Sequence, residues 1–355
     1  MNRISIKDIA REVGVSHQTV SRVINNHPDV AAVTRKRVLE VVRLRGYRPN
    51  ALARGLVKQY SRILGVITND LLKFGPASAL AGMEEQANRL NYGLLIRLVP
   101  HGDEASAGKA VESLLSNQVD GIIWAGGAYG EQFDRFAEKS LNLDIPMVFT
   151  DVSDGLNVSF AAIDNRHGGK IATEHLLEQG YWHIGIITGD LNWWAARHRK
   201  KGWEDVLQKA GLPPRPMHIA EGDWSAESGE RAFYQLIRQY PELDAVFASN
   251  DQIGLGVLKA AHDLNIRVPE QIGVIGFDDI PESGYFIPPL TTIHQFQDKV
   301  GHGAVEMLDQ AIHAKRDGEG NGNLLDENPV ERAQALEKQW FQPELVIRRS
   351  TLKTS

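Results

Sequence analysis

The 355-residue sequence contains no cysteine. Disulfide bonds and thiolate metal sites are therefore excluded, and the composition fits a reducing compartment. No apolar run reaches the roughly 20 residues that a membrane-spanning helix needs, and the first residues lead into polar, helix-patterned sequence without the apolar region of a signal peptide. We therefore expect a cytoplasmic protein with no membrane partner.

Acidic residues are scarce at the N-terminal end. Residues 1–60 contain twelve Lys and Arg against four Asp and Glu, whereas the remainder contains 27 basic and 41 acidic residues. A basic head ahead of an acidic body predicts a polyanionic partner for the head alone. The chain also exceeds one average domain in length and can bury a sizeable core.

Two short helices joined by a glycine turn are predicted within this basic head. The first begins with a capping-box-like pattern at Ser5 and stops at Gly14, and Ser16 caps the second. A third helix is predicted near 34–45. The pattern is typical of a helix-turn-helix, with a small solvated three-helix bundle as the alternative. The polar residues expected on the outer face of the second helix are His17, Gln18, Ser21, Arg22 and Asn25.

The stretch 47–61 joins the basic head to the acidic body. Pro49 ends the preceding helix, Asn50 is a good N-cap, and Leu52 and Leu56 lie four residues apart on one face. Isolated helices shorter than about 12 residues are poorly stable in water. We therefore expect a helix here that orders only when another surface packs on it.

Residues 6–10, 14–25 and 47–53 closely resemble the head of the lactose/galactose repressor family of bacterial transcriptional regulators. The resemblance implies that the second helix enters the major groove of operator DNA and that Leu56 wedges into the minor groove. Arg can fork onto guanine and Gln onto adenine, whereas hydroxyls at a helix N-terminus suit phosphate. The implied base-reading residues are His17, Gln18 and Arg22, and the other implied DNA-binding residues are Ser16, Thr19, Ser21, Asn25, Asn50 and Leu56.

From residue 62 onward, apolar runs alternate with amphipathic helices in two series. Such alternation predicts parallel sheets covered on both faces, and two series imply two subdomains. The fold class is thus a small all-α helix-turn-helix head plus an α/β core of two doubly wound parallel-sheet subdomains, which the resemblance describes as periplasmic-binding-protein-like. The expected boundaries are 1–46 for the head, 47–61 for the hinge, 62–163 with 293–335 for the first subdomain, and 164–292 with 336–355 for the second. A flexible loop is expected at 316–323, partly helical chain at 329–340, and a last strand at 345–349.

Polar side chains follow several of the predicted strands, where ligands of such sheets bind. Carboxylates, amides and guanidinium groups can hydrogen-bond sugar hydroxyls, and aromatic faces can pack on a sugar ring. Taken singly, each polar residue could equally be a loop cap or a surface ion pair. With the resemblance, the ligand-binding candidates are Phe74, Asp151, Arg199, Trp224, Asn250, Asp278 and Gln295. The positions that depart from the pattern are His17, Ala195 and Phe296, and extra aromatic residues occur at Trp193 and Trp194.

The sequence contains no complete motif of an enzyme or a cofactor site. The glycines at 102 and 108 are wrongly spaced for a phosphate loop, those at 254 and 256 lack the third glycine of a dinucleotide site, and no nucleophile elbow is present. We expect no enzyme activity and no cofactor.

The sequence therefore predicts a dimeric repressor that binds a pseudo-palindromic operator and is released by a small sugar or glycoside. A corepressor-dependent regulator is the main alternative. A sugar-binding transport receptor or a sugar enzyme would need features that are missing here.

Overall fold

The computed structural model describes residues 4–24, 26–47, 60–152, 155–320 and 336–353. The chain divides into two compact units, residues 1–61 and 62–355. The predicted DNA-binding residues Asn25, Asn50 and Leu56 lie outside the described residues. Within those residues, no helix combines the length and apolarity needed to cross a lipid bilayer.

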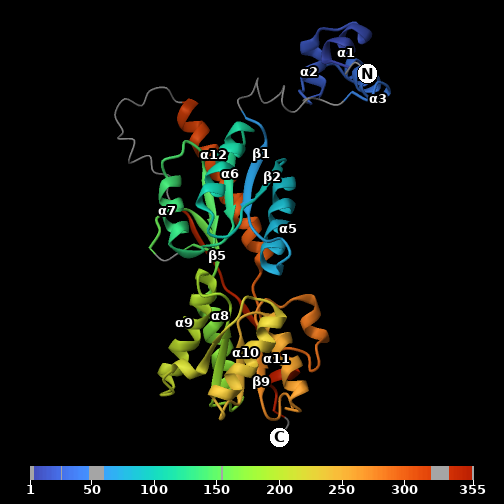
Figure 1. Ribbon diagram of the computed structural model, residues 1–355. Helices are drawn as coiled ribbons and strands as arrows, with labels where there is room; N and C mark the ends of the chain where they lie inside the picture. The colour runs from blue at the N-terminus through green and yellow to red at the C-terminus, as the bar shows by residue number, and fades with distance from the viewer. Residues whose placement is uncertain (1–3, 25, 48–59, 153–154, 321–335, 354–355) are drawn as a thin grey trace. The chain divides into compact units, whose positions relative to one another are not determined.

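The described residues of the first unit form three helices, α1 (Ile6–Val13), α2 (His17–Ile24) and α3 (Ala32–Leu44) (Figure 1). Ser5 and Asp8 form a reciprocal capping box at the start of α1, and Gly14 ends it with a left-handed φ of 76°. The buried core of this unit consists of Ile9, Ala10, Val13, Val20, Val23 and Val38. The helix-turn-helix predicted from the sequence is therefore present.

A six-stranded parallel sheet forms the centre of the first subdomain, in the order β11-β5-β4-β3-β1-β2. Its strands are β1 (Ile63–Thr68), β2 (Gly93–Leu98), β3 (Gly121–Ala125), β4 (Met147–Thr150), β5 (Phe160–Ile163) and β11 (Lys338–Phe341). Helices α6 (Glu104–Ser116) and α7 (Gly130–Ser140) pack on one face, and α5 (Phe74–Arg89) and α12 (Gln297–Gly320) pack on the other. Each face thus has its own apolar core.

The second subdomain repeats this plan with a four-stranded parallel sheet in the order β7-β6-β8-β9. Its strands are β6 (Ile184–Thr188), β7 (Ile219–Glu221), β8 (Ala245–Ala248) and β9 (Gly273–Ile275). Helices α8 (Asn165–Glu178) and α9 (Trp194–Lys209) cover one face, and α10 (Ala226–Gln239) and α11 (Asp251–Asp263) cover the other. The two doubly wound sheets predicted from the sequence are both present.

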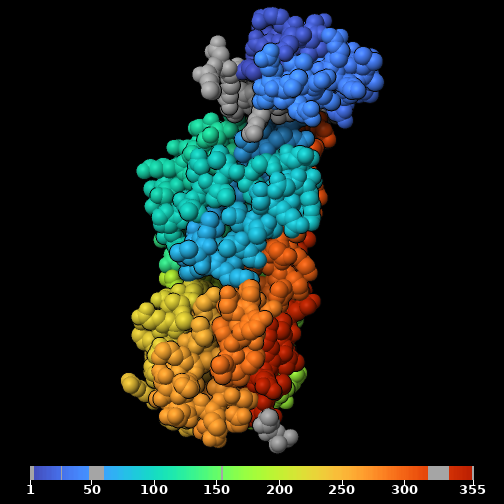
Figure 2. All heavy atoms as spheres, turned by 90° about the vertical axis from the view of Figure 1, so that its right-hand side faces the viewer, coloured from blue at the N-terminus to red at the C-terminus, as the bar shows by residue number. Residues whose placement is uncertain are grey.

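The C-terminal part of the chain contributes to both subdomains. Strand β12 (Glu344–Val346) pairs antiparallel with β10 (Thr292–His294), and in Figure 2 this red segment lies beside the orange residues of the second subdomain. Ser350 is fully buried and donates its hydroxyl to the Val274 carbonyl at 2.6 Å. The side chain of Thr351 contacts His175 Nε2 at 2.8 Å. Residues 344–351 are thus part of the second subdomain's core.

Two expectations for this region were wrong. The loop expected from residue 316 begins as helix, because α12 continues to Gly320 and Arg316 forms an ion pair with Asp120 at 3.3 Å. That contact offsets the helix-weakening effect of Gly318. Residues 338–341 form β11 in the first sheet, where Trp340 packs edge-on against Phe160. The last crossing between subdomains therefore follows Phe341, later than the expected position near 335.

Candidate functional site

Helix α2 presents the predicted DNA-reading residues to solvent. Ser16 accepts a hydrogen bond from the backbone N–H of Thr19 at 3.0 Å, which caps the helix. His17, Gln18 and Arg22 are exposed, whereas the valines on the opposite face are buried. Ser16 is exposed, and Thr19 and Ser21 are half-buried. The face required for groove reading is therefore polar and accessible.

The seven predicted ligand-binding residues line one cavity of about 320 Å³ between the two subdomains. They come from the segments that follow β4, β7, β8, β9 and β10, together with the start of α5 and the second turn of α9. Ligands of doubly wound sheets bind at this edge. The predicted residues that line the cavity are Phe74, Asp151, Arg199, Trp224, Asn250, Asp278 and Gln295.

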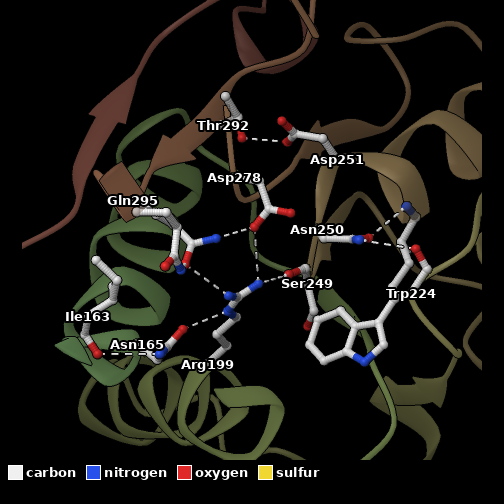
Figure 3. Close-up of polar contacts among 12 residues, drawn as sticks. Ile163, Asn165, Arg199, Trp224, Ser249, Asn250, Asp251, Asp278, Thr292 and Gln295 are labelled. Carbon is white, nitrogen blue, oxygen red and sulfur yellow. Dashed lines mark hydrogen bonds and ion pairs between the residues drawn. The ribbon is translucent and has the colours of Figure 1, made fainter. Parts of the chain in front are cut away.

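Arg199 is the centre of a buried polar network (Figure 3). Its Nε donates to Asn165 Oδ1 at 2.8 Å, and its Nη2 donates to Gln295 Oε1 at 3.2 Å. Its Nη1 donates to the Ser249 carbonyl and lies 3.5 Å from Asp278 Oδ1. Burial lowers the pKa of Arg199 and the neighbouring carboxylates oppose this, so the guanidinium remains charged.

Close packing fixes the position of Arg199. A Cβ added at Gly169 would lie 2.2 Å from the Arg199 carbonyl oxygen, so only glycine lets α8 and α9 approach this closely. The guanidinium carbon also lies 3.8 Å from the centroid of the Phe277 ring. The side chain is therefore held from its backbone to its charged end.

Asp278 and Asp279 point to different partners, as expected for adjacent residues. Asp278 accepts from Gln295 Nε2, whereas Asp279 pairs with Arg348 at 2.7 Å and with His294 at 2.9 Å. Burial raises the pKa of Asp278 to about 6, and the charge of Arg199 opposes this. Asp278 thus faces the cavity, while Asp279 holds the second subdomain together.

Asp151 enters the cavity from the first subdomain. The residue is partly exposed, but its carboxyl group is enclosed, and this burial raises its pKa to about 6 against the opposing charge of Arg199. Its carboxylate has no hydrogen bond to any residue that the structure describes. Its φ of 53° lies in the left-handed region. Backbone strain of this kind concentrates at binding sites.

Trp224 lies across the cavity wall in an uncommon backbone conformation. Its φ is 76°, and a Cβ added at Gly189 would lie 2.2 Å from the indole. The Trp224 carbonyl accepts from Asn250 Nδ2 at 3.0 Å, and Asn250 Oδ1 caps α11 through the N–H of Ile253. The Asn250 amide is thus engaged in holding Trp224 and α11 in place.

Several cavity residues were not among the predicted ligand-binding set. Asn69 follows β1 in the same way that Asp151 follows β4, so the strand-end rule could have identified it. Trp193 and Ala195 also line the cavity, whereas Trp194 and Phe296 do not. The other cavity-lining polar residues that were missed are Lys73, Thr150, Asp223, Ser225, Gln252 and Gln297.

Comparison with known proteins places both units in one family. Residues 5–50 match the lacI family of bacterial regulatory proteins, and residues 173–351 match the periplasmic binding protein-like domain. The HTH-type transcriptional repressor PurR of Haemophilus influenzae strain PittEE is 34% identical over 348 residues, which cover 98% of each chain. The lactose operon repressor of Escherichia coli strain K12 is 32% identical over 308 residues, which cover 87% of this chain and 84% of that protein.

A solved structure of the lac repressor dimer bound to operator and the anti-inducer ONPF has a TM-score of 0.87 and 29% identity, and the match covers 99% of this chain and 100% of that one. The head and the two-subdomain core therefore define a transcriptional repressor with a DNA-binding domain and a ligand-binding domain. The chain belongs to the lacI family of bacterial regulatory proteins. The resemblance stated from the sequence is confirmed.

Proposed function

We propose that the protein is a homodimeric repressor that binds a pseudo-palindromic operator and is released when a small sugar or glycoside occupies the cavity. Helix α2 supplies His17, Gln18 and Arg22 for base reading, with Ser16, Thr19 and Ser21 near phosphates. Asn25, Asn50 and Leu56 complete the proposed DNA contacts on sequence grounds. A dimer in the matched operator complex supports two-fold binding here.

The network of Arg199 carries the proposal for the effector. Arg199 bonds to Asn165, which follows the first crossing between subdomains, and to Gln295, which follows the second. At the third crossing, the Asp164 N–H donates to the Phe341 carbonyl at 3.0 Å. A ligand that contacts Arg199 or Asp278 therefore acts on groups attached to the connecting segments. Such a ligand shifts the subdomains only if it binds the released arrangement better than the operator-bound one.

The cavity composition favours a sugar. Carboxylates at Asp151 and Asp278 can accept hydrogen bonds from hydroxyl groups, and the indole of Trp224 offers a flat apolar face. In a corepressor-dependent regulator, a ligand in the same site would strengthen operator binding instead of weakening it. Measuring operator affinity with and without the ligand distinguishes induction from corepression.

Calorimetry with a panel of monosaccharides and disaccharides, combined with operator titrations by fluorescence anisotropy, tests the proposal. Arg199→Ala and Asp278→Ala should abolish sugar binding, while Arg267→Ala, an exposed site outside the cavity, should not change it. The sugar must weaken operator affinity by the same factor that the operator weakens sugar affinity. Unchanged binding in both cavity variants would refute the site, and tighter operator binding with sugar would replace induction by corepression.

A further inference from the structure

The charges of the cavity point to one class of ligand. Three carboxylates line it, those of Asp151, Asp223 and Asp278, against two cations, Lys73 and Arg199. Another carboxylate, Asp251, is fully buried and accepts hydrogen bonds from the Ile280 N–H at 2.8 Å and from the Thr292 hydroxyl. Burial, and then the negative charge of Asp278, raises the pKa of Asp251 well above its usual value, so the surroundings of Asp278 disfavour a further negative charge. The site therefore carries an excess of negative charge.

Arg199 has little capacity left for an anionic ligand. A guanidinium has five N–H groups, and those of Arg199 already point at Asn165, Ser249, Gln295 and Asp278. At most one N–H remains, so the two-pronged contact that arginine makes with phosphate or carboxylate cannot form. The charge of Arg199 is also balanced by Asp278 within the site.

Two of the helix starts that face the cavity from the second subdomain, those of α10 and α11, carry side-chain caps. The first turn of α10 is capped by Ser225, and that of α11 by Asn250, which is followed by the acidic Asp251. The start of α9 has no side-chain cap, but its Trp194 N–H donates to the Ala128 carbonyl at 2.9 Å. Free helix N-termini attract anions, but those of α10 and α11 are satisfied by the protein's own side chains. Lys73, at the start of α5, is the remaining cation of the cavity.

The open groups of the cavity accept hydrogen bonds. Asp151 has no hydrogen bond to the residues that the structure describes, and Gln295 and Arg199 both contact Asp278 through Oδ1. Hydroxyl groups can donate to these oxygens, whereas a phosphate or carboxylate group would be repelled by them.

We propose that the cavity takes an uncharged, hydroxyl-rich ligand and rejects the phosphorylated or carboxylated form of the same molecule. The inference rests on the proposed sugar effector and names its chemical class. Like charges brought together in a binding site are strongly unfavourable, so an anionic form should bind roughly 100-fold more weakly than its neutral parent.

The test uses full-length protein and matched compounds that differ in charge: glucose, its phosphate ester and glucuronate; galactose with the same two derivatives; and guanosine with its monophosphate. Calorimetry should detect binding of a neutral parent and at least a roughly 100-fold loss for its anionic derivatives. Asp278→Asn should reduce the affinity difference between the neutral parent and its anionic derivatives, because it removes one repelling charge. Asp263→Asn, which makes the same charge change at an exposed carboxylate paired with Lys259, should leave it unchanged.

A derivative that binds as tightly as its parent would overturn the proposal, and loss of that binding in Lys73→Met would locate the anion at the start of α5. Binding of guanosine but of neither free sugar, with guanosine monophosphate excluded, would refute the sugar effector and leave the charge rule intact. The two proposals can therefore fail separately.

Discussion

The backbone of Trp193, in the second subdomain, pairs antiparallel with that of Tyr129, in the first. The Gly130 N–H donates to the Asn192 carbonyl at 3.0 Å, and the Trp194 N–H donates to the Ala128 carbonyl at 2.9 Å. The Trp193 ring packs edge-on against His101 and Tyr129, with centroid distances of 4.5 and 5.2 Å. This contact joins the subdomains beside the cavity, in addition to the covalent crossings.

Trp193→Ala should weaken effector binding by about 1–2 kcal/mol, because it removes an aromatic wall of the cavity and the ring contacts across the subdomains. Trp182→Ala is the matched control, since Trp182 is exposed and does not line the cavity. Calorimetry measures both variants. Equal affinities for wild type and Trp193→Ala would show that the ring contributes nothing to the bound state.

Arg22→Ala should reduce affinity for the selected operator by roughly 1–3 kcal/mol and affinity for random DNA much less, because a base-reading arginine discriminates between sequences. Anisotropy titrations at one fixed salt concentration compare the two DNAs, with Arg267→Ala as a control for lost positive charge. An equal loss on both DNAs would assign Arg22 to phosphate contact only.

Leu56→Ala should impair operator binding while leaving sugar affinity nearly unchanged, since the proposed wedge acts on DNA alone. This prediction rests on the sequence, because Leu56 lies outside the described residues. Limited proteolysis with and without operator tests whether residues 47–61 become protected. Equal protection in free protein would contradict coupled ordering.

Sugar affinity should fall as the pH drops from about 7.5 to about 5. Asp151 and Asp278 have pKa values raised to about 6 by burial, so both become protonated over this range and lose strength as hydrogen-bond acceptors. Their folded pKa lies above the unfolded value of 3.8, so their contribution to the stability of the free protein is greatest at low pH and is lost as the pH rises through 6.

Calorimetry in buffers of different ionisation enthalpy should therefore detect proton release on sugar binding near pH 6. The facing ionisable groups are Arg199, whose charge opposes both pKa increases, and Asp251, whose own pKa is raised by burial and by Asp278. Asp278→Asn should remove part of the proton release. A pH-independent affinity between about 5 and 7.5 would exclude both carboxylates from ligand contact.

The protein should sediment as a dimer at micromolar concentration, because reading two half-sites requires a two-fold pair of heads. Analytical ultracentrifugation distinguishes the species. A stable tetramer would contradict this expectation.

The sequence predicted the elements that depend on local patterns. Capping at Ser5, the turn at Gly14 and the alternation of strands and helices are set by neighbouring residues, and the structure confirms them. The rule that ligands bind at the carboxyl ends of strands likewise identified Asp151 and Asp278, and both line one cavity. The roles of glycines in close helix packing, as at Gly169, depend on distant segments and could not be read from local sequence.

The errors arose where tertiary contacts outweigh local preference. Gly318 suggested a loop, but the ion pair of Arg316 with Asp120 holds the helix. The strand at Trp340 was not predicted, because it forms only through pairing with β5, where Trp340 packs against Phe160. The engagement of Arg199 by four protein groups was similarly invisible, because these groups are spread over 130 positions from Asn165 to Gln295.

The burial of Ser350 and Thr351 in the second subdomain has a consequence for biosynthesis. During translation, residues 164–294 leave the ribosome well before residues 344–351, which supply a strand and two buried hydroxyl groups to the same fold. The first subdomain likewise waits for α12 and β11. Neither half can therefore complete its core until residues 338–351 have been synthesised, although domains often fold as they emerge. The nascent head, whose three helices are contiguous near the N-terminus, is the part that can fold first.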